Sequence, residues 1–127
     1  MTVKRLSDEA LDKILHNQVF RPVNIVIKFY TNSCPMCHAL QEYYEDIAES
    51  FNDDEETYFF AYNVSEDTSV EKMLNFKGVP TIVMVKPDPN MPKQRLSKFK
   101  VMPDPEPPND ETWYRSKDIK RFIERNT

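Results

Sequence analysis

The sequence predicts an α/β protein with a mixed sheet of four to five strands and about four helices. Segments with the composition of strands alternate with segments whose apolar residues recur at helical spacing. Predicted helices separate the early strands, which favours parallel pairing, whereas only a turn separates the last two, which favours an antiparallel pair. The 127 residues are enough for one sizeable core, and we expect a single domain over residues 1–127.

The first half of the chain is expected to supply the centre of the sheet. A weak strand near residues 3–6 is followed by a helix that Ser7 caps and that ends near Asn17. Residues 23–30 have too few polar positions for a solvent-exposed face, so we expect them to form a buried central strand. A second helix follows, and the residues expected on its inner face are Leu40, Tyr43, Tyr44, Ile47 and Phe51.

Three further strands are predicted in the second half of the chain. Residues 57–64 are β-branched and aromatic, which is typical of a strand. Residues 80–85 and 96–101 are expected to pair antiparallel, with the latter as an outer strand. The acidic residues 52–56 are interpreted as an exposed loop, and the proline-rich residues 102–109 as an irregular loop.

Two helices complete the predicted fold. A short helix over residues 68–76 begins with Asp67 or Thr68 as its cap, and Ser116 caps the closing helix. The residues expected to face inward from these two helices are Val70, Met73, Leu74, Ile119, Phe122 and Ile123.

Composition argues against several classes of protein. A net charge of −4 and a pI near 5.2 argue against nucleic acid as the main partner. No apolar run approaches the roughly 20 residues that cross a bilayer. The first residues, MTVKRLSDEALDKIL, are charged where a signal peptide needs an apolar core. We therefore expect a cytoplasmic monomer that does not contact membranes.

The only two cysteines, Cys34 and Cys37, lie where the predicted central strand gives way to a helix. Pro35 suits the first helical position, and a residue before proline avoids helical dihedrals, which suits Cys34 as the N-cap. The Cys34 sulfur would then face the positive helix end, which favours a thiolate. Cys37 is close enough to attack a mixed disulfide formed at Cys34, so the pair predicts dithiol–disulfide exchange.

Two other uses of the cysteines fit the sequence less well. A structural disulfide closing so small a loop gives little stabilisation, and it would not persist in a reducing compartment. A structural zinc ion needs four protein ligands, and His16 and His38 do not form the usual second pair. We therefore predict neither a metal nor a cofactor.

Three segments resemble the thioredoxin family. IVIKFYTNSCPMCHAL is similar to that family's active-site strand and helix, FKGVPTIVMVK to its cis-proline segment, and SKDIKRFIERN to its closing helix. The resemblance runs from about residue 23 to residue 86 and again through the last helix. It implies a three-layer α/β/α thioredoxin fold and a thiol–disulfide oxidoreductase. The implied enzyme reduces protein disulfides and is restored by thioredoxin reductase or by glutathione.

The resemblance also implies roles for individual residues. Cys34 corresponds to the attacking thiol and Cys37 to the resolving thiol. Gly78, Val79, Pro80 and Thr81 form the turn whose proline is cis and faces the cysteines. In this family the backbone of the residue before that proline, here Val79, pairs with an extended substrate segment, which is recognition by strand addition.

Several positions depart from the usual pattern of the family. Pro35 and Met36 replace the common Gly-Pro pair, which tunes the redox potential, and Tyr30 replaces a tryptophan that packs beside the site. His38 replaces a surface lysine, and we expect it to be an exposed residue that tunes the thiolate rather than an essential acid or base. Two alternative functions stay open: a glutaredoxin-like enzyme recycled by glutathione, to which the proline after Cys34 is similar, and a non-catalytic interaction module, since fold alone does not define function.

Lys28 is the departure with the largest mechanistic consequence. It occupies the position of the buried acid that accepts the proton of the family's resolving thiol. A buried lysine has a lowered pKa, so it could accept a proton when neutral or favour thiolates when charged. The interpretation we favour from sequence is that Lys28 extends to the surface and has no catalytic part.

Overall fold

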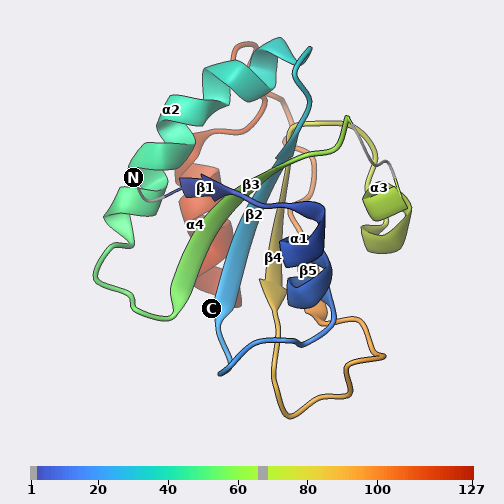
Figure 1. Cartoon of the computed structure of the whole chain (residues 1–127). Coiled ribbons are helices and arrows are strands. Elements are labelled where there is room, and N and C mark those ends of the chain that lie inside the picture. The colour runs from blue at the N-terminus through green and yellow to red at the C-terminus, as the bar shows by residue number, and fades with distance from the viewer. Residues whose placement is uncertain (1–2, 66–68) are drawn as a thin grey trace.

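A computed structural model describes residues 3–65 and 69–127. Its centre is a five-stranded sheet with the order β1-β3-β2-β4-β5 (Figure 1). β1 and β2 both run parallel to β3, whereas β4 runs antiparallel to β2 and β5 antiparallel to β4. The strands are β1 (Val3–Arg5), β2 (Asn24–Tyr30), β3 (Thr57–Asn63), β4 (Thr81–Lys86) and β5 (Lys98–Val101). This confirms the predicted mixed sheet and the central position of β2.

Four helices cover the two faces of the sheet. They are α1 (Asp8–Leu15), α2 (Pro35–Ser50), α3 (Ser69–Leu74) and α4 (Ser116–Asn126). The buried side chains of α2 and α4 belong to one core cluster, and those of α1 and α3 to another. Figure 1 shows α2 and α4 on one side of the sheet and α1 and α3 on the other, which confirms a three-layer α/β/α arrangement.

β2 is buried on both faces because its side chains alternate between the two core clusters. Val26 and Tyr30 pack on the α2 and α4 side, whereas Ile27 and Phe29 pack on the α1 and α3 side. Each fully buried apolar side chain of this kind contributes about 1.5–3 kcal/mol to folding. The same alternation places Lys28 on the face of Val26 and Tyr30, beneath α2.

Two aromatic or thioether side chains that were expected to face inward are exposed instead. Tyr43 is 48% exposed and Met73 is 43% exposed, so these two predictions are wrong. In α2 the buried stripe passes through Leu40 and Tyr44, and in α3 it passes through residues 70 and 74. Tyr43 and Met73 lie one position before Tyr44 and Leu74, to the side of each buried stripe, where the helix surface meets solvent.

The helix caps agree with the sequence in part. Ser7 caps α1, and its Oγ accepts a hydrogen bond from the Ala10 N–H at 3.1 Å, as predicted. Ser116 is the first residue of α4 rather than its cap, since Arg115 occupies the N-cap position without a side-chain hydrogen bond. The predicted caps Asp67 and Thr68 lie outside the described residues. No helix within the described part of the chain has the length and apolar character needed to span a membrane.

Candidate active site

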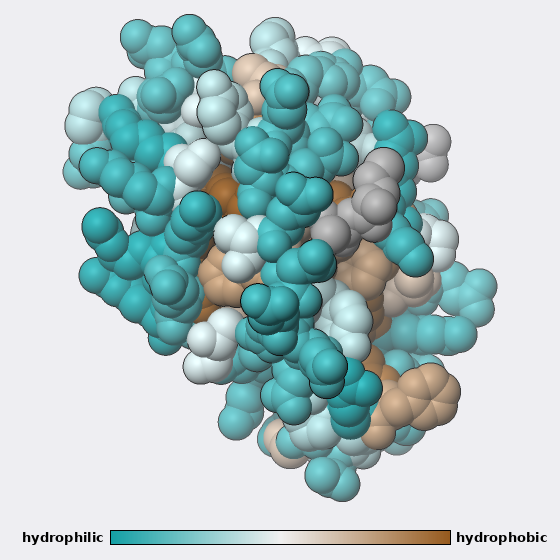
Figure 2. All heavy atoms as spheres, turned by 90° about the vertical axis from the view of Figure 1, so that its left-hand side faces the viewer, coloured by the Kyte–Doolittle hydropathy of each residue, from teal (hydrophilic) through white to brown (hydrophobic). Residues whose placement is uncertain are grey.

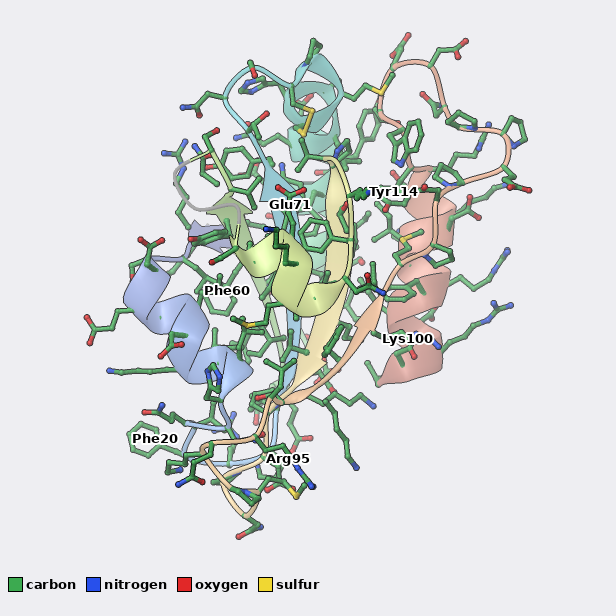
Figure 3. All side chains as sticks on the ribbon, turned by 90° about the vertical axis from the view of Figure 1, so that its right-hand side faces the viewer. Phe20, Phe60, Glu71, Arg95, Lys100 and Tyr114 are labelled. Carbon is green, nitrogen blue, oxygen red and sulfur yellow. A yellow bond between two sulfur atoms is a disulfide. The ribbon has the colours of Figure 1, made fainter. Side chains whose placement is uncertain are left out.

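Cys34 and Cys37 lie at the junction of β2 and α2 and are joined by a disulfide bond (Figure 3). Cys34 has the extended backbone of an N-cap, with φ −98° and ψ 104°, and Pro35 is the first residue of α2. The Cys37 N–H donates to the Cys34 Sγ over 3.1 Å. The local geometry is therefore the one predicted, with a proline-initiated helix and a cysteine sulfur at its N-terminus.

The two sulfur atoms lie in different environments. Cys34 is half-buried, whereas Cys37 is only 1% exposed. No acidic side chain occupies the first turn of α2 to oppose the positive end of the helix. In the reduced protein this end would favour the Cys34 thiolate. The half-buried Cys34 can thus meet an external disulfide, whereas Cys37 is enclosed and is bonded to Cys34.

The turn before β4 meets the cysteine pair. The Val79–Pro80 peptide bond is cis, and the Val79 carbonyl oxygen lies 3.8 Å from the Cys34 Sγ. The Thr81 Oγ1 donates to the Gly78 carbonyl at 2.7 Å, and the Gly78 N–H donates to the Glu71 carboxylate at 3.3 Å. These hydrogen bonds hold the backbone of residues 78–80 beside the sulfur that an external disulfide would approach.

Gly78 allows this turn because its φ is +80°, a region that other residues adopt at a cost. A Cβ added at Gly78 would have no neighbour within 4 Å, so the cost of substitution comes from the backbone alone. We expect Gly78→Ala to lower the free energy of unfolding by about 1–2 kcal/mol, and Gly78→Asn to lower it less because asparagine tolerates positive φ. Urea unfolding of the two variants would measure this, and equal stability of Gly78→Ala and the parent protein would contradict it.

Lys28 does not extend to the surface, so that part of the favoured interpretation from sequence is wrong. The side chain is only 4% exposed because α2 covers this face of β2. Its Nζ lies 5.6 Å from the centre of the Tyr30 ring and 5.5 Å from that of Tyr44. Burial lowers the pKa of Lys28 to about 8, although the Glu45 carboxylate partly opposes this shift.

The other predicted supporting residues surround the same site. Tyr30 is buried, and the Arg5 guanidinium lies 5.9 Å from its ring centre. His38 is exposed, and its Nε2 lies 2.8 Å from the Asn32 carbonyl oxygen, which can only accept, so Nε2 carries a proton. Pro35 is exposed and Met36 half-buried in the first turn of α2. The His38 ring is thus tied to the loop before Cys34, and it belongs to the surface.

Three residues beside the site were not predicted from the sequence. Arg5 and Glu45 line a cavity together with Cys37 and Lys28. Trp113 lies in the loop after β5 and packs against the same core cluster as Cys34 and Val79. Figures 1 and 3 both place this loop at the end of the molecule where α2 begins. As the only tryptophan in the chain, Trp113 offered a weak signal, whereas Arg5 and Glu45 offered none.

The described residues offer no site for a metal ion. Within residues 3–65 and 69–127, no three or more His, Cys, Asp or Glu side chains come together in a way that could hold one. The disulfide occupies both cysteines in this structure.

The fold and the site define a class of protein in which a CXXC pair lies at the N-terminus of a helix that packs against a mixed sheet. The chain belongs to the thioredoxin family, whose model matches residues 2–99. Thioredoxin-fold proteins with a CXXC pair are typically oxidoreductases, and members of the family generally act on protein disulfides. A comparison with curated protein sequences finds no match.

Solved structures with the same fold differ widely in sequence from this chain. The Trx4 domain of ERdj5 matches with a TM-score of 0.71 and 11% identity over 99% of this chain and 96% of that one. Chloroplastic thioredoxin z matches with a TM-score of 0.64 and 21% identity over 98% and 94%. The J-Trx1 fragment of ERdj5 matches with a TM-score of 0.67 and 14% identity over 98% of this chain, which spans only 50% of that fragment. Likeness at these identities shows the fold.

Proposed function

We propose that this protein is a thiol–disulfide oxidoreductase that reduces protein disulfides by dithiol exchange at Cys34 and Cys37. The observation that carries the proposal is the arrangement of the Cys34 sulfur. It is half-buried at the N-terminus of α2, bonded to a buried partner cysteine, and 3.8 Å from the Val79 carbonyl oxygen. A reactive thiol backed by a second thiol is a device for disulfide exchange.

The proposed cycle has two exchange steps. The Cys34 thiolate attacks one sulfur of a substrate disulfide, forms a mixed disulfide and releases the other sulfur as a thiolate that takes a proton from solvent. Cys37 then loses its proton to solvent, and its thiolate attacks the Cys34 sulfur. This step forms the Cys34–Cys37 disulfide and releases the second substrate thiolate. Two electrons have then passed from the protein to the substrate.

The turn of Gly78, Val79, Pro80 and Thr81 is proposed to bind the substrate. An extended segment beside Cys34 could form main-chain hydrogen bonds with Val79, which would give broad specificity. Lys28 is mostly protonated at neutral pH because its pKa is about 8. Since Lys28 lines the same cavity as Cys37, its charge would favour the Cys37 thiolate during the second step.

The reductant that restores the two thiols is proposed to be thioredoxin reductase or glutathione, and the protein is proposed to act as a cytoplasmic monomer. The two reductants can be separated by measuring turnover with each of them. Turnover with glutathione alone would favour the glutaredoxin-like alternative. A proline directly after the first cysteine, here Pro35, is similar to the glutaredoxin pattern.

The reduction potential of the Cys34–Cys37 pair tests the proposed function and its direction. We expect the reduced protein to accelerate the reduction of insulin disulfides and its potential to lie near about −270 mV, as in thioredoxin-type reductants. A potential near about −120 mV would indicate an oxidant instead. A double Cys34→Ser, Cys37→Ser variant provides the control. The non-catalytic module would be favoured by two results together: the parent protein does not reduce insulin, and the double variant still supports the function of a partner protein.

A further inference from the structure

A cavity of about 380 Å³ lies between β1, β2 and the first half of α2, and Cys37 forms part of its lining. This volume is in the range of sites that bind small molecules. Figure 2 views the molecule from the side of α2 and shows a mostly hydrophilic surface with apolar residues in recesses between the hydrophilic ones. The cavity walls combine the rings of Tyr30 and Tyr44 with charged groups. It is separate from the turn that is proposed to bind the disulfide substrate.

The sheet places two cations on either side of a small residue in this cavity. Arg5 of β1 and Lys28 of β2 both pair with Ala61 of β3, so the three residues form one row across the sheet. Paired residues point to the same face, and the outer two are roughly 9–10 Å apart at Cα. The Ala61 side chain is too short to fill the space between its neighbours. The Arg5 guanidinium and the Lys28 Nζ both lie within 6 Å of the Tyr30 ring centre, at 5.9 Å and 5.6 Å.

The charge of the cavity is positive. Lys4, Arg5 and Lys28 line it with a single carboxylate, that of Glu45, and the other titratable side chains on its wall are Tyr30, Tyr44 and the exposed His38. Arg5 and Lys28 lie on one face of the sheet, so two positive charges face the single negative charge of Glu45, whereas Lys4 alternates to the opposite face. An anion is therefore attracted to this space, and a cation is repelled.

The environment of the Lys28 ammonium group is the strongest indication that the cavity binds a ligand. Its side chain is 96% buried, and its Nζ forms no hydrogen bond and no ion pair with any residue that the structure describes. The contacts with the Tyr30 and Tyr44 rings offset part of the lost hydration, typically about 0.5–2 kcal/mol. No fully buried side-chain nitrogen or oxygen of the described residues lacks a partner, so the Lys28 Nζ keeps contact with the solvent of the cavity. An anion there would give this ammonium group a charged acceptor in place of water.

We propose that this cavity is a binding site for a small aromatic or apolar carboxylate. Its carboxylate group would lie above Ala61 between Lys28 and Arg5, and its apolar body against the rings of Tyr30 and Tyr44. The lining of the cavity is more apolar than polar, which favours such a molecule over an inorganic anion. This site goes beyond the proposed redox function, although Cys37 forms part of its wall.

The proposal is tested by titrating the oxidised protein with benzoate and following the backbone amides by NMR. Benzamide is the neutral control, since it has nearly the shape of benzoate but no charge, and inorganic phosphate is the control for charge without a ring. We expect saturable shifts at Lys28, Cys37 and Ala61 with benzoate, and at least about tenfold weaker binding of benzamide, because charge-assisted hydrogen bonds contribute about 1.5–3 kcal/mol.

Two variants locate the binding. Lys28→Met is expected to weaken benzoate binding about tenfold or more, whereas Lys100→Met should leave it unchanged. Lys100 is an exposed lysine on β5, at the opposite edge of the sheet from β1 (Figure 3). Equal affinities for benzoate and benzamide, phosphate binding as tight as that of benzoate, or unchanged affinity in Lys28→Met would overturn the proposal. The titration involves no turnover, so its result is independent of the redox activity.

Discussion

Cys34→Ser is expected to reduce the rate of insulin-disulfide reduction to that of the uncatalysed reaction with dithiothreitol. A serine hydroxyl is not ionised at neutral pH, so the positive end of α2 has no thiolate to stabilise and no sulfur remains for the mixed disulfide. Cys37→Ser is expected to behave differently. It keeps the attacking sulfur but lacks the group that resolves the intermediate, so mixed disulfides between Cys34 and substrate proteins should accumulate.

The accumulation can be measured by mass spectrometry or non-reducing gels after mixing Cys37→Ser with reducible substrate. Ser33→Ala is the matched control, because it changes an exposed residue next to Cys34 and leaves both sulfur atoms in place. Full activity of Cys34→Ser would contradict the proposed cycle. If instead the two cysteine variants trapped substrate equally, the assignment of attacking and resolving roles would be wrong.

Local features of the sequence were enough to predict the attacking half of the site. Cys34, Pro35 and Cys37 are neighbours in the chain, and the preferences that make Cys34 an N-cap depend only on the residues beside it. The central position of β2 was also predictable, because an apolar run without a solvent-exposed face must be covered on both sides. In contrast, the predicted inner face of α2 wrongly included Tyr43, which is exposed, because helical spacing alone did not exclude it.

The other half of the site depends on how the strands pair. Phe29 of β2 lies opposite Thr81 of β4, and this antiparallel register brings the residues just before Thr81 to the end of β2, where Cys34 lies. The periodicity of the sequence does not determine such a register, and only the resemblance to thioredoxins suggested it. Arg5 reaches the site through the pairing of β1 with β3, which a three-residue edge strand does not reveal.

Lys28 shows why burial could not be inferred from residue type. Lysine is rarely fully buried, and its long side chain usually reaches water. In this fold Lys28 lies on the face of β2 that α2 covers, and the cavity beside Cys37 provides the space for its ammonium group. Alternation along the strand places Lys28 among apolar side chains. Whether its side chain reaches the protein surface depends on the position of α2, which the sequence does not give.

Replacing this lysine by an apolar side chain is therefore expected to stabilise the protein. In the folded state the pKa of Lys28 is lowered from 10.5 to about 8, chiefly by burial, so the charged form is disfavoured by folding. Such a shift corresponds to a destabilisation on the order of 3 kcal/mol below pH 8. We expect Lys28→Met to raise the free energy of unfolding by about this amount at pH 7, as found when buried charges are replaced by apolar groups of similar size.

The pH dependence of this gain distinguishes a charge effect from better packing. Below pH 8 Lys28 is protonated in both states, and the penalty is fully present. Between pH 8 and about 10.5 the unfolded chain still binds the proton while the folded protein has lost it, so the stability of the parent protein rises with pH. The advantage of Lys28→Met over the parent should therefore shrink across this range, with Lys100→Met as a control that shows no such trend. Urea unfolding of the oxidised proteins from pH 6 to 10 measures it, and a gain that did not vary with pH would show that packing, and not the buried charge, separates the two proteins.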